Sequence, residues 1–383
     1  RLAAEEDPLA RAMATETLEA IQTWGLQDHL QGGFFRYFTD RQWTIPHFEK
    51  MLYDQSLALW TFALAFKVLG KESYRFTALK ILTCLVESFE EDGFYATAFD
   101  ADTGHEEGAT YLWGYGELQE LLPPEAFSRF IENYLITEEG NFEGLNHLVR
   151  RHRRSPDPDA AGSHLPDPAE ALLLAVRKQR PQPARDDKIL SGQNALTATA
   201  LIEAGRFLDR PDLEDKGEAL VRRILDLFWN GGTLGHSAFR GEVQRQPFLT
   251  DTATLLLAVT LLAETREGWA KVTEELVQAV LAFREGEVWL ESRADDFRPV
   301  AASRFDHPTP SGVSLAEMAL TRAALLTGMD YPPTVYHQPW MSDFLNINTL
   351  ILNGEFHVIT TEKPVPWLEL PAHSIQKKGS PAT

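Results

Sequence analysis

Cysteine is almost absent from this sequence. Cys84 is the only one in 383 residues, and it stands within an apolar helical pattern. A single thiol excludes an internal disulfide, a cysteine-based zinc site and a CxxC redox motif. We therefore expect the protein in a reducing compartment, the cytoplasm.

Long apolar runs and an excess of basic charge are also missing. The longest apolar stretches, such as residues 255–262, fall far short of the roughly 20 residues that a membrane helix requires, and no basic-then-apolar leader opens the chain. Asp and Glu outnumber Lys and Arg by 56 to 36, a balance that repels the phosphate backbone of nucleic acids. The sequence predicts a soluble protein that binds neither nucleic acid nor a membrane.

Several familiar catalytic motifs do not occur. The sequence has no GxGxxG, GxSxG, P-loop or HExxH, so nucleotide-binding, serine-hydrolase and zinc-protease interpretations have no support. The acidic loop at residues 99–113 lacks EF-hand spacing, because Gly104 occupies the third ligand position. We expect neither a metal nor a cofactor.

What the sequence does contain is a repeat of helices and glycine turns. Turns that combine glycine with aromatic or aliphatic residues recur at 32–36, 92–95, 140–142, 231–234 and 286–289. Most of their spacings match one helical hairpin, and the chain accommodates about six. Such hairpins can stack as an open solenoid or close into a ring.

The composition of the expected helices favours the ring. Strongly apolar helices at 51–69, 195–205, 252–264 and 313–326 each follow a polar cluster, whereas 212–227 carries a charged face. Helices that are apolar all round are buried ones, and amphipathic helices lie outside them. We predict an all-α fold, an (α/α)6 toroid with polar helix starts at one rim and short β pieces in the inter-helix turns. A solenoid explains only the repeat.

Two segments interrupt the pattern and set the expected domain limits. Residues 150–186, around a short helix at 168–179, form an irregular excursion between the halves of a barrel at 1–330. Residues 331–383 form an extension with a β-hairpin at 349–360 around Asn353-Gly354 and a mobile tail over the last dozen residues. Because the first residue is not Met, we expect the chain to begin inside a longer gene product.

Residues 32–54 form the densest polar and aromatic group. Pro46 favours a helix start, so His47, Lys50 and Asp54 should share one helix face. Glu49 would then lie in the first turn, where the helix dipole favours an anion. Sugar sites need this mixture, because hydroxyls bind polar groups while pyranose C–H faces pack on aromatic rings. The alternative is a capped helix with a buried ion pair. The candidates just upstream are Arg36, Tyr37, Asp40 and Trp43.

Three further groups of residues give weaker evidence for a functional site. Crowded carboxylates at 99–113 favour a raised pKa, as a general acid requires, although a solvated acidic turn explains them equally well. Residues 186–194 form either a polar rim or a helix cap with an ion pair. His236 and Arg240 lie on an extended piece after a glycine turn, where such residues are more often structural. The candidates in the first two groups are Asp100, Asp102, Glu107, Tyr111, Trp113, Asp187, Lys188, Ser191 and Asn194.

These motifs carry a resemblance to a known family. The runs GGFFRYFTDRQWTIPHFEKMLYDQ, FDADTGHEEGATYLW, GNFEGLNHL and DDKILSGQN closely resemble the spermatogenesis-associated, thioredoxin-domain-containing proteins. The resemblance implies an (α/α)6 toroid of the six-hairpin glycosidase type, related to N-acylglucosamine and cellobiose 2-epimerases. It also implies an N-terminal thioredoxin-like domain, which we expect to be absent from this chain.

The second half departs from the family's pattern. Gln193-Asn194-Ala195 stands where the family usually has Trp-Asn-Gly, and Thr250-Asp251-Thr252-Ala253 replaces an Asp-Asp-Tyr-Ala element. A Pro-Ser-Gly-Asn-Ser element appears as residues 310–314, with Ser311 and Val313. Asp251 and Ser311 are therefore further candidates for substrate binding. The changes imply either a different ligand or a fold retained without catalysis.

The sequence thus predicts a carbohydrate-active protein that uses general acid/base chemistry. For 2-epimerisation, the expected acid and base are His47 and His236. For glycoside hydrolysis, two carboxylates must flank the bond, and we expect them among Asp40, Glu49, Asp54, Asp100 and Asp102. The competing hypothesis is a non-catalytic scaffold that partners a thioredoxin-like domain or a client protein.

Overall fold

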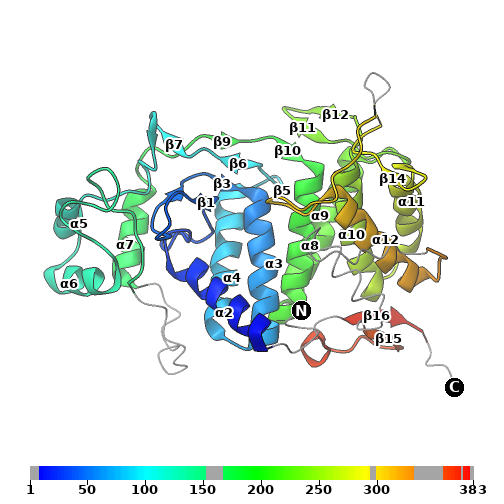
Figure 1. Cartoon of the computed structure of the whole chain (residues 1–383), viewed down its shortest axis with the longest axis horizontal. Helices are drawn as coiled ribbons and strands as arrows, with labels where there is room; N and C mark the ends of the chain where they lie inside the picture. The colour runs from blue at the N-terminus through cyan, green and yellow to red at the C-terminus, as the bar shows by residue number, and fades with distance from the viewer. Residues whose placement is uncertain (1–7, 152–166, 294–298, 332–356, 372–373, 380–383) are drawn as a thin grey trace. The chain divides into compact units, whose positions relative to one another are not determined.

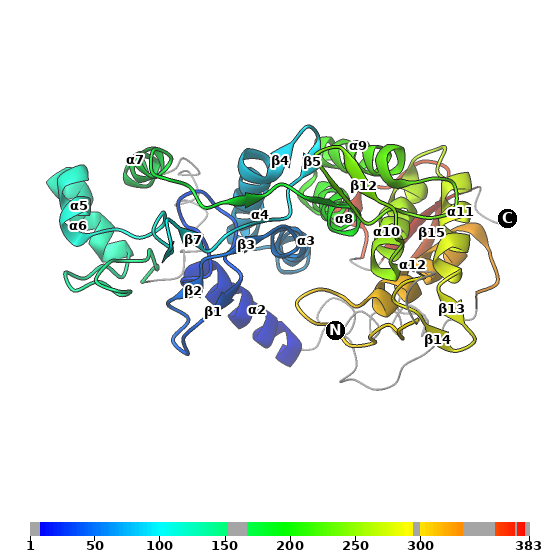
Figure 2. The same ribbon diagram turned by 90° about the horizontal axis from the view of Figure 1, so that it is seen from above.

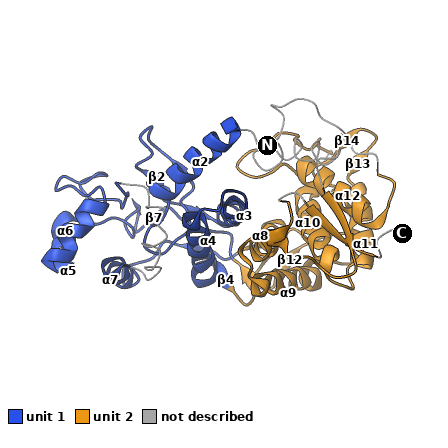
Figure 3. Cartoon of the chain, turned by 90° about the horizontal axis from the view of Figure 1, so that it is seen from below, with its two compact units in different colours: residues 1–90, 96–187 blue, residues 91–95, 188–383 orange. Residues whose placement is uncertain are grey.

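The computed structural model describes residues 8–151, 167–293, 299–331, 357–371 and 374–379 (Figure 1). Helices predominate within these ranges. The chain divides into two compact units, one of residues 1–90 and 96–187 and the other of residues 91–95 and 188–383 (Figure 3). No helix in the described ranges is both long and apolar enough to cross a membrane.

Unit 1 is built from helices joined by very short strands. Helix α3 is apolar and ends at Leu69, and the φ of 67° at the next residue, Gly70, suits glycine after a helix C-terminus. Strands β3, β6 and β9 form an antiparallel sheet, and β1 pairs with β2 so that Tyr37 lies opposite His47. The helices are α2 (Pro8–Thr23), α3 (Leu52–Leu69), α4 (Glu72–Cys84) with the π turn η1 (Leu85–Phe89), α5 (Tyr115–Leu121), α6 (Pro124–Asn133) and α7 (Pro168–Arg177). The strands are β1 (Tyr37–Phe38), β2 (Pro46–His47), β3 (Lys50–Met51), β6 (Ala98–Phe99), β7 (Asp102–Thr103), β8 (Glu106–Glu107) and β9 (Arg185–Asp186).

Unit 2 shows the expected division into buried and amphipathic helices. Helices α8 (Ser191–Leu208), α10 (Leu249–Thr265) and α12 (Gly312–Thr327) are buried along nearly their whole length. Helices α9 (Pro211–Phe228) and α11 (Ala270–Leu281) bury one face only. In Figure 2, α10 lies between α8 and α12 and packs on both. The prediction of an all-α fold of helical hairpins, with short β pieces in the turns, is confirmed.

Short strands connect the helices of unit 2. Strands β10 (Ile189–Leu190), β11 (Ser237–Phe239) and β12 (Glu242–Gln244) form an antiparallel sheet next to the starts of α8 and α10. Strands β13 (Arg284–Glu285) and β14 (Val288–Trp289) form a hairpin after α11. Between residues 90 and 95, β4 (Glu90–Glu91) and β5 (Phe94–Tyr95) flank the turn at Asp92-Gly93, where both φ angles are positive.

The C-terminal segment closes over a buried cluster of charges in unit 2. Strand β15 (His357–Thr361) pairs in parallel with β16 (Ser374–Lys378), and η4 (Trp367–Glu369) lies between them in sequence. The backbone N–H of Gln376 donates to Glu264 Oε2 at 3.2 Å. Glu264 also pairs with Arg206 and Arg322, and the Trp367 ring lies 4.0 Å from the Arg206 guanidinium. Buried charges are tolerated when they are paired in this way.

Some expected boundaries differ from those observed. Pro46 does not begin a helix: it lies in β2, and α3 begins only at Leu52. Helix α8 begins at Ser191, so the expected cap residues 191–194 are its first turn. The predicted turn at Asn353-Gly354 and residues 152–166 of the excursion lie outside the described residues. In the expected mobile tail, the structure describes β16, with Ile375 buried.

Candidate functional site

His47 and Glu107 form a hydrogen-bonded pair in unit 1. His47 Nδ1 lies 2.7 Å from Glu107 Oε1, and the imidazole stacks on Tyr37 with centroids 5.0 Å apart, because the two residues are opposite one another on β1 and β2. A carboxylate acceptor holds the proton on Nδ1 and leaves Nε2 to accept or donate another. That nitrogen is 3.8 Å from Glu49 Oε2.

Arg36 connects Glu49 to the start of α3. Its Nη1 donates to Glu49 Oε2 at 2.7 Å, and its Nε donates to the hydroxyl of Tyr53 at 3.0 Å. Both contacts leave the guanidinium partly exposed. The arrangement presents a fixed cation beside the imidazole of His47, where it can bind hydroxyl or carbonyl oxygen.

Asp54 is a partly buried acid in the first turn of α3. Its Oδ2 is buried and has no hydrogen-bond partner within the described ranges. Burial raises the pKa of Asp54 to about 7, with Glu49 adding to the rise and Arg36 opposing it. The helix N-terminus favours the ionised form, so loss of solvation is the dominant effect here. Near neutral pH Asp54 can therefore donate a proton.

The loop before His47 holds an aromatic side chain in a strained conformation. Trp43 has φ of 61°, a left-handed angle that bulky residues avoid. Asp40 fixes the loop by accepting the N–H groups of Thr44 and Ile45, both at 2.9 Å, and Trp43 stacks on Phe38. Backbone strain of this kind costs about 1–3 kcal/mol and concentrates at functional sites. Trp43 is 36% exposed.

Lys50 does not share a face with His47 and lies in a buried ion pair. Its Nζ donates to Asp28 Oδ2 at 2.7 Å, and Arg177 donates to both oxygens of the same carboxylate. Burial alone would raise the pKa of Asp28, but Arg177 and Lys50 hold it well below its usual range. The side chain of Lys50, which the sequence predicted to bind substrate, is only 3% exposed, so a ligand could reach it only if the residues around it moved. The alternative, a buried ion pair, describes this residue.

Three other expected binding residues are also buried. Trp113 packs in the cluster formed by α5, α6 and α7, and Tyr111 packs on Phe35. Asn194 bonds the backbone N–H and carbonyl of Tyr95. Their polar atoms and rings therefore support neighbouring elements, and contact with a ligand would require these elements to move.

The remaining expected residues occupy the surface or a cap. Asp100 and Asp102 are exposed, and Asp100 accepts the N–H of Asp102 at 3.2 Å, as in the solvated acidic turn. Asp187 pairs with Arg185. Ser311 caps α12 by accepting the N–H of Ser314. Lys188 and Arg240 are exposed.

Unit 2 repeats the pairing of a histidine with a carboxylate. His236 Nδ1 lies 2.6 Å from Oδ2 of Asp251, in the first turn of α10, and its ring packs on Phe248. The hydrogen bond to Asp251 raises the pKa of His236, while burial raises that of Asp251. Gly192 makes room for this carboxylate, because a Cβ there would lie 2.2 Å from Asp251 Oδ1. His236 is 31% exposed at its side chain.

Sequence reasoning missed the partners in these pairs. It named the two histidines and their carboxylates but did not connect His47 with Glu107 or His236 with Asp251. Tyr53, which holds Arg36, precedes Asp54 directly in the first motif, and that adjacency was the available signal. Within the described residues, no group of three or more His, Cys, Asp or Glu side chains is arranged to hold a metal ion.

Comparison with known proteins identifies homologues of this chain. No family model matches it. Spermatogenesis-associated protein 20 of Rattus norvegicus is 30% identical in an alignment 386 positions long, and the alignment covers 87% of this chain and 47% of the rat protein. The Homo sapiens protein of the same name is 35% identical over 276 residues, covering 60% of this chain and 35% of its own. The chain spans about half of the length of the rat protein and about a third of that of the human protein.

A solved structure supports the fold. Cellobiose 2-epimerase from Bacillus thermoamylovorans B4167 matches with a TM-score of 0.50 over 90% of this chain and 72% of its own, at 12% sequence identity. A likeness at this identity concerns the fold alone. It agrees with the six-hairpin arrangement that the sequence resemblance implied, whereas the thioredoxin-like domain stays a prediction.

Proposed function

We propose that this chain acts on carbohydrate by general acid/base chemistry, as a sugar epimerase or isomerase. The main support is the same side-chain arrangement in both units: a carboxylate bonds Nδ1 of a partly exposed histidine, at 2.7 Å for His47 and 2.6 Å for His236. A histidine held in this way exchanges protons through Nε2. The epimerase named above adds support through its fold.

In 2-epimerisation the configuration at C2 of a ring-opened aldose is inverted. A base removes the C2 proton, the C–H electron pair forms a C1–C2 double bond, and the carbonyl oxygen takes up the negative charge. A proton then returns to C2 from the other face, and the carbonyl is restored. Within unit 1 we propose His47 as a proton-transfer group, Arg36 as a donor to sugar oxygens, and Tyr37 and Trp43 as surfaces for sugar C–H groups. Within unit 2 we propose His236 as a proton-transfer group.

Deuterium incorporation tests this function directly. The protein is incubated in heavy water with free aldoses, N-acetylated sugars and short oligosaccharides, and C2 is followed by NMR. Loss of a general base lowers the rate by about 10²–10⁴-fold, so His47→Ala should be slow if unit 1 carries the reaction, and His236→Ala should be slow if unit 2 does. His307→Ala, at an exposed histidine, is the matched control. Wild-type protein that leaves every C2 proton in place would refute the epimerase.

Glycoside hydrolysis is the second candidate, and the raised pKa of Asp54 favours it. A protonated Asp54 would serve as general acid, and Glu49, paired with Arg36, would be the second carboxylate. New reducing ends in the same sugar pool, lost in both Asp54→Asn and Glu49→Gln, would establish this reaction. If neither deuterium nor reducing ends appear with folded protein, the scaffold for a thioredoxin-like domain or client protein is favoured.

A further inference from the structure

Inversion at C2 needs a proton-transfer group on each face of the sugar, and in unit 2 the His236–Asp251 pair supplies one. Asp251 is not free to act as the second, because its carboxylate already bonds His236 and the backbone N–H of Gly192. Glu291, a partly exposed residue shortly after β14, is the next carboxylate along this helix start. Its backbone carbonyl accepts the N–H of Leu249, the first residue of α10, at 2.9 Å. A second acid is therefore held where α10 begins.

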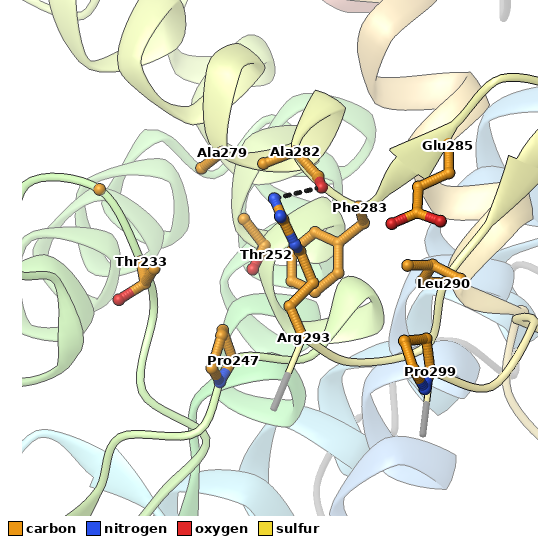
Figure 4. A pocket seen from close by; sticks show the side chains of 11 residues that line it. Thr233, Pro247, Thr252, Ala279, Ala282, Phe283, Glu285, Leu290, Arg293 and Pro299 are labelled. Atoms are coloured by element: carbon orange, nitrogen blue, oxygen red, sulfur yellow. Dashed lines mark hydrogen bonds between the residues drawn. The ribbon is translucent and has the colours of Figure 1, made fainter. Parts of the chain in front are cut away.

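The first turn of α10 directs its side chains to different neighbours, because successive side chains leave an α-helix about 100° apart. Asp251 lies against Gly192 of α8, where a Cβ would come within 2.2 Å of its Oδ1. Thr250 lies against Gly312 of α12, where a Cβ would come within 2.7 Å of its Oγ1. Thr252 lines a separate cavity beside the end of α11 (Figure 4). Since α10 lies between α8 and α12, Asp251 and Thr250 face opposite neighbours.

Thr250 holds Glu291 on the α12 side of this helix start. Its Oγ1 donates to Glu291 Oε1 at 3.3 Å, and Oε2 of Glu291 has no hydrogen-bond partner among the described residues. His236 lies on the α8 side, where its backbone carbonyl accepts the N–H of Ser191, the first residue of α8, at 2.9 Å. His236 and Glu291 therefore flank the start of α10 from opposite sides.

Phe248 lies between the two groups, at the residue before α10. Its ring contacts the imidazole of His236 with centroids 4.6 Å apart, and its backbone pairs with Ser292, the residue after Glu291. His236, Phe248 and Glu291 are each partly exposed, so none of them requires a neighbouring element to move before it meets a ligand. Sugar C–H groups pack on aromatic rings, and Phe248 offers such a ring between two polar groups.

The surroundings of Glu291 favour proton exchange. Burial raises the pKa of Glu291, the hydrogen bond from Thr250 opposes the rise, and the charge of Asp251 adds to it. General acids and bases work best when their pKa lies near the working pH. A carboxyl group that titrates above its ordinary range can therefore give a proton as well as take one.

We propose that Glu291 is the second proton-transfer group of unit 2 and acts on the face of the sugar opposite His236, a role that rests on the proposed epimerase function. From one epimer, Nε2 of His236 takes the C2 proton, the C–H electron pair forms the C1–C2 double bond, and the carbonyl oxygen becomes an anion. The carboxyl group of Glu291 then gives its proton to the other face of C2, which restores the carbonyl and leaves a carboxylate. From the other epimer the two roles are reversed.

C2 epimers that are supplied one at a time separate the two groups. D-glucose, D-mannose, N-acetyl-D-glucosamine and N-acetyl-D-mannosamine are each incubated in heavy water, and proton NMR follows loss of the C2 proton and formation of the other epimer. Glu291→Gln retains an oxygen that accepts the bond from Thr250, so the variant should fold as the wild type does. Inversion should fall by about 10²–10⁴-fold, whereas one epimer of the pair should still exchange its C2 proton through His236.

His236→Ala should show the reciprocal pattern. Exchange should persist only in the epimer that Glu291→Gln no longer exchanges, because each group removes the proton from one face. A purely structural role of Glu291 would not divide the two epimers in this way. Glu287→Gln, at an exposed glutamate in the turn between β13 and β14, is the matched control and should invert both epimers at the wild-type rate.

The possible results separate this role from the proposed function. If the wild type interconverts neither pair of epimers, the epimerase function and the role of Glu291 are both overturned. If the wild type interconverts a pair and Glu291→Gln does so at the same rate, only the role of Glu291 is overturned. The same holds if folded Glu291→Gln, checked by circular dichroism, loses exchange from both epimers alike.

Discussion

Replacement of Asp54 by Asn should stabilise the protein more at high pH than at low pH. The pKa of Asp54 is about 7 in the folded protein and about 3.9 in an unfolded chain. Because the folded-state pKa is the higher one, the folded protein binds the proton more tightly, and stability rises as pH falls from about 7 toward 4. Above pH 7 the buried carboxylate is ionised and its lost solvation destabilises the fold.

The magnitude follows from the linkage between pKa and stability. Between pH 8 and pH 5 the contribution of Asp54 changes by about 2–3 kcal/mol. Asn does not titrate, so the gain from Asp54→Asn should be larger at pH 8 by that amount. Urea unfolding of both proteins at the two pH values measures it, and this double difference cancels any pH-independent effect of the new amide.

A matched variant separates burial from charge. Asp330 is an exposed aspartate, and Asp330→Asn should show less than about 0.5 kcal/mol of such a difference, as surface substitutions do. If Asp54→Asn gives the same small difference, the carboxylate is solvated, and its proposed role as a general acid loses its basis.

Three other substitutions test the described contacts. Trp43→Gly should leave stability in thermal unfolding unchanged or raise it by up to about 1 kcal/mol, because glycine adopts the left-handed φ without strain. A loss of about 2 kcal/mol would show that contacts of the Trp43 ring stabilise the fold. Burial lowers the pKa of His147 to about 4, so protonation favours unfolding as pH falls below about 6.5. Between pH 8 and pH 5 the wild type should therefore lose about 2 kcal/mol of stability relative to His147→Gln. Equal pH profiles of the two proteins would contradict this. Asp28→Asn leaves Lys50 and Arg177 as buried cations and should cost about 3–5 kcal/mol in urea unfolding, whereas a cost below 1 kcal/mol would mean that water reaches the cluster.

The helices could be predicted from the sequence because their pattern is local. Residues 249–265 are apolar all round and α9 is amphipathic, so burial and exposure followed directly from composition. The start of α3 could not be found in the same way. Pro46 suits the first turn of a helix, but it also suits a short strand, and here pairing with β1 determined the outcome.

The candidate site is formed by pairs of residues that are distant in the sequence. His47 and Glu107 are 60 residues apart, and Arg177 reaches Asp28 across 149. Residue type alone identified His47 and Lys50 equally well as polar side chains near a helix start. Only the tertiary contacts show that one remains partly exposed beside a carboxylate while the other is enclosed between Asp28 and the backbone of Gly32.

The bond between Gln376 and Glu264 has a consequence for biosynthesis. The two residues are 112 positions apart, so a ribosome must translate nearly the whole of unit 2 before this contact can form. Until then the charges at the ends of α8, α10 and α12 lack the cover of Trp367 and β16. A nascent chain should therefore remain sensitive to proteases in this unit until its last strand emerges from the ribosome.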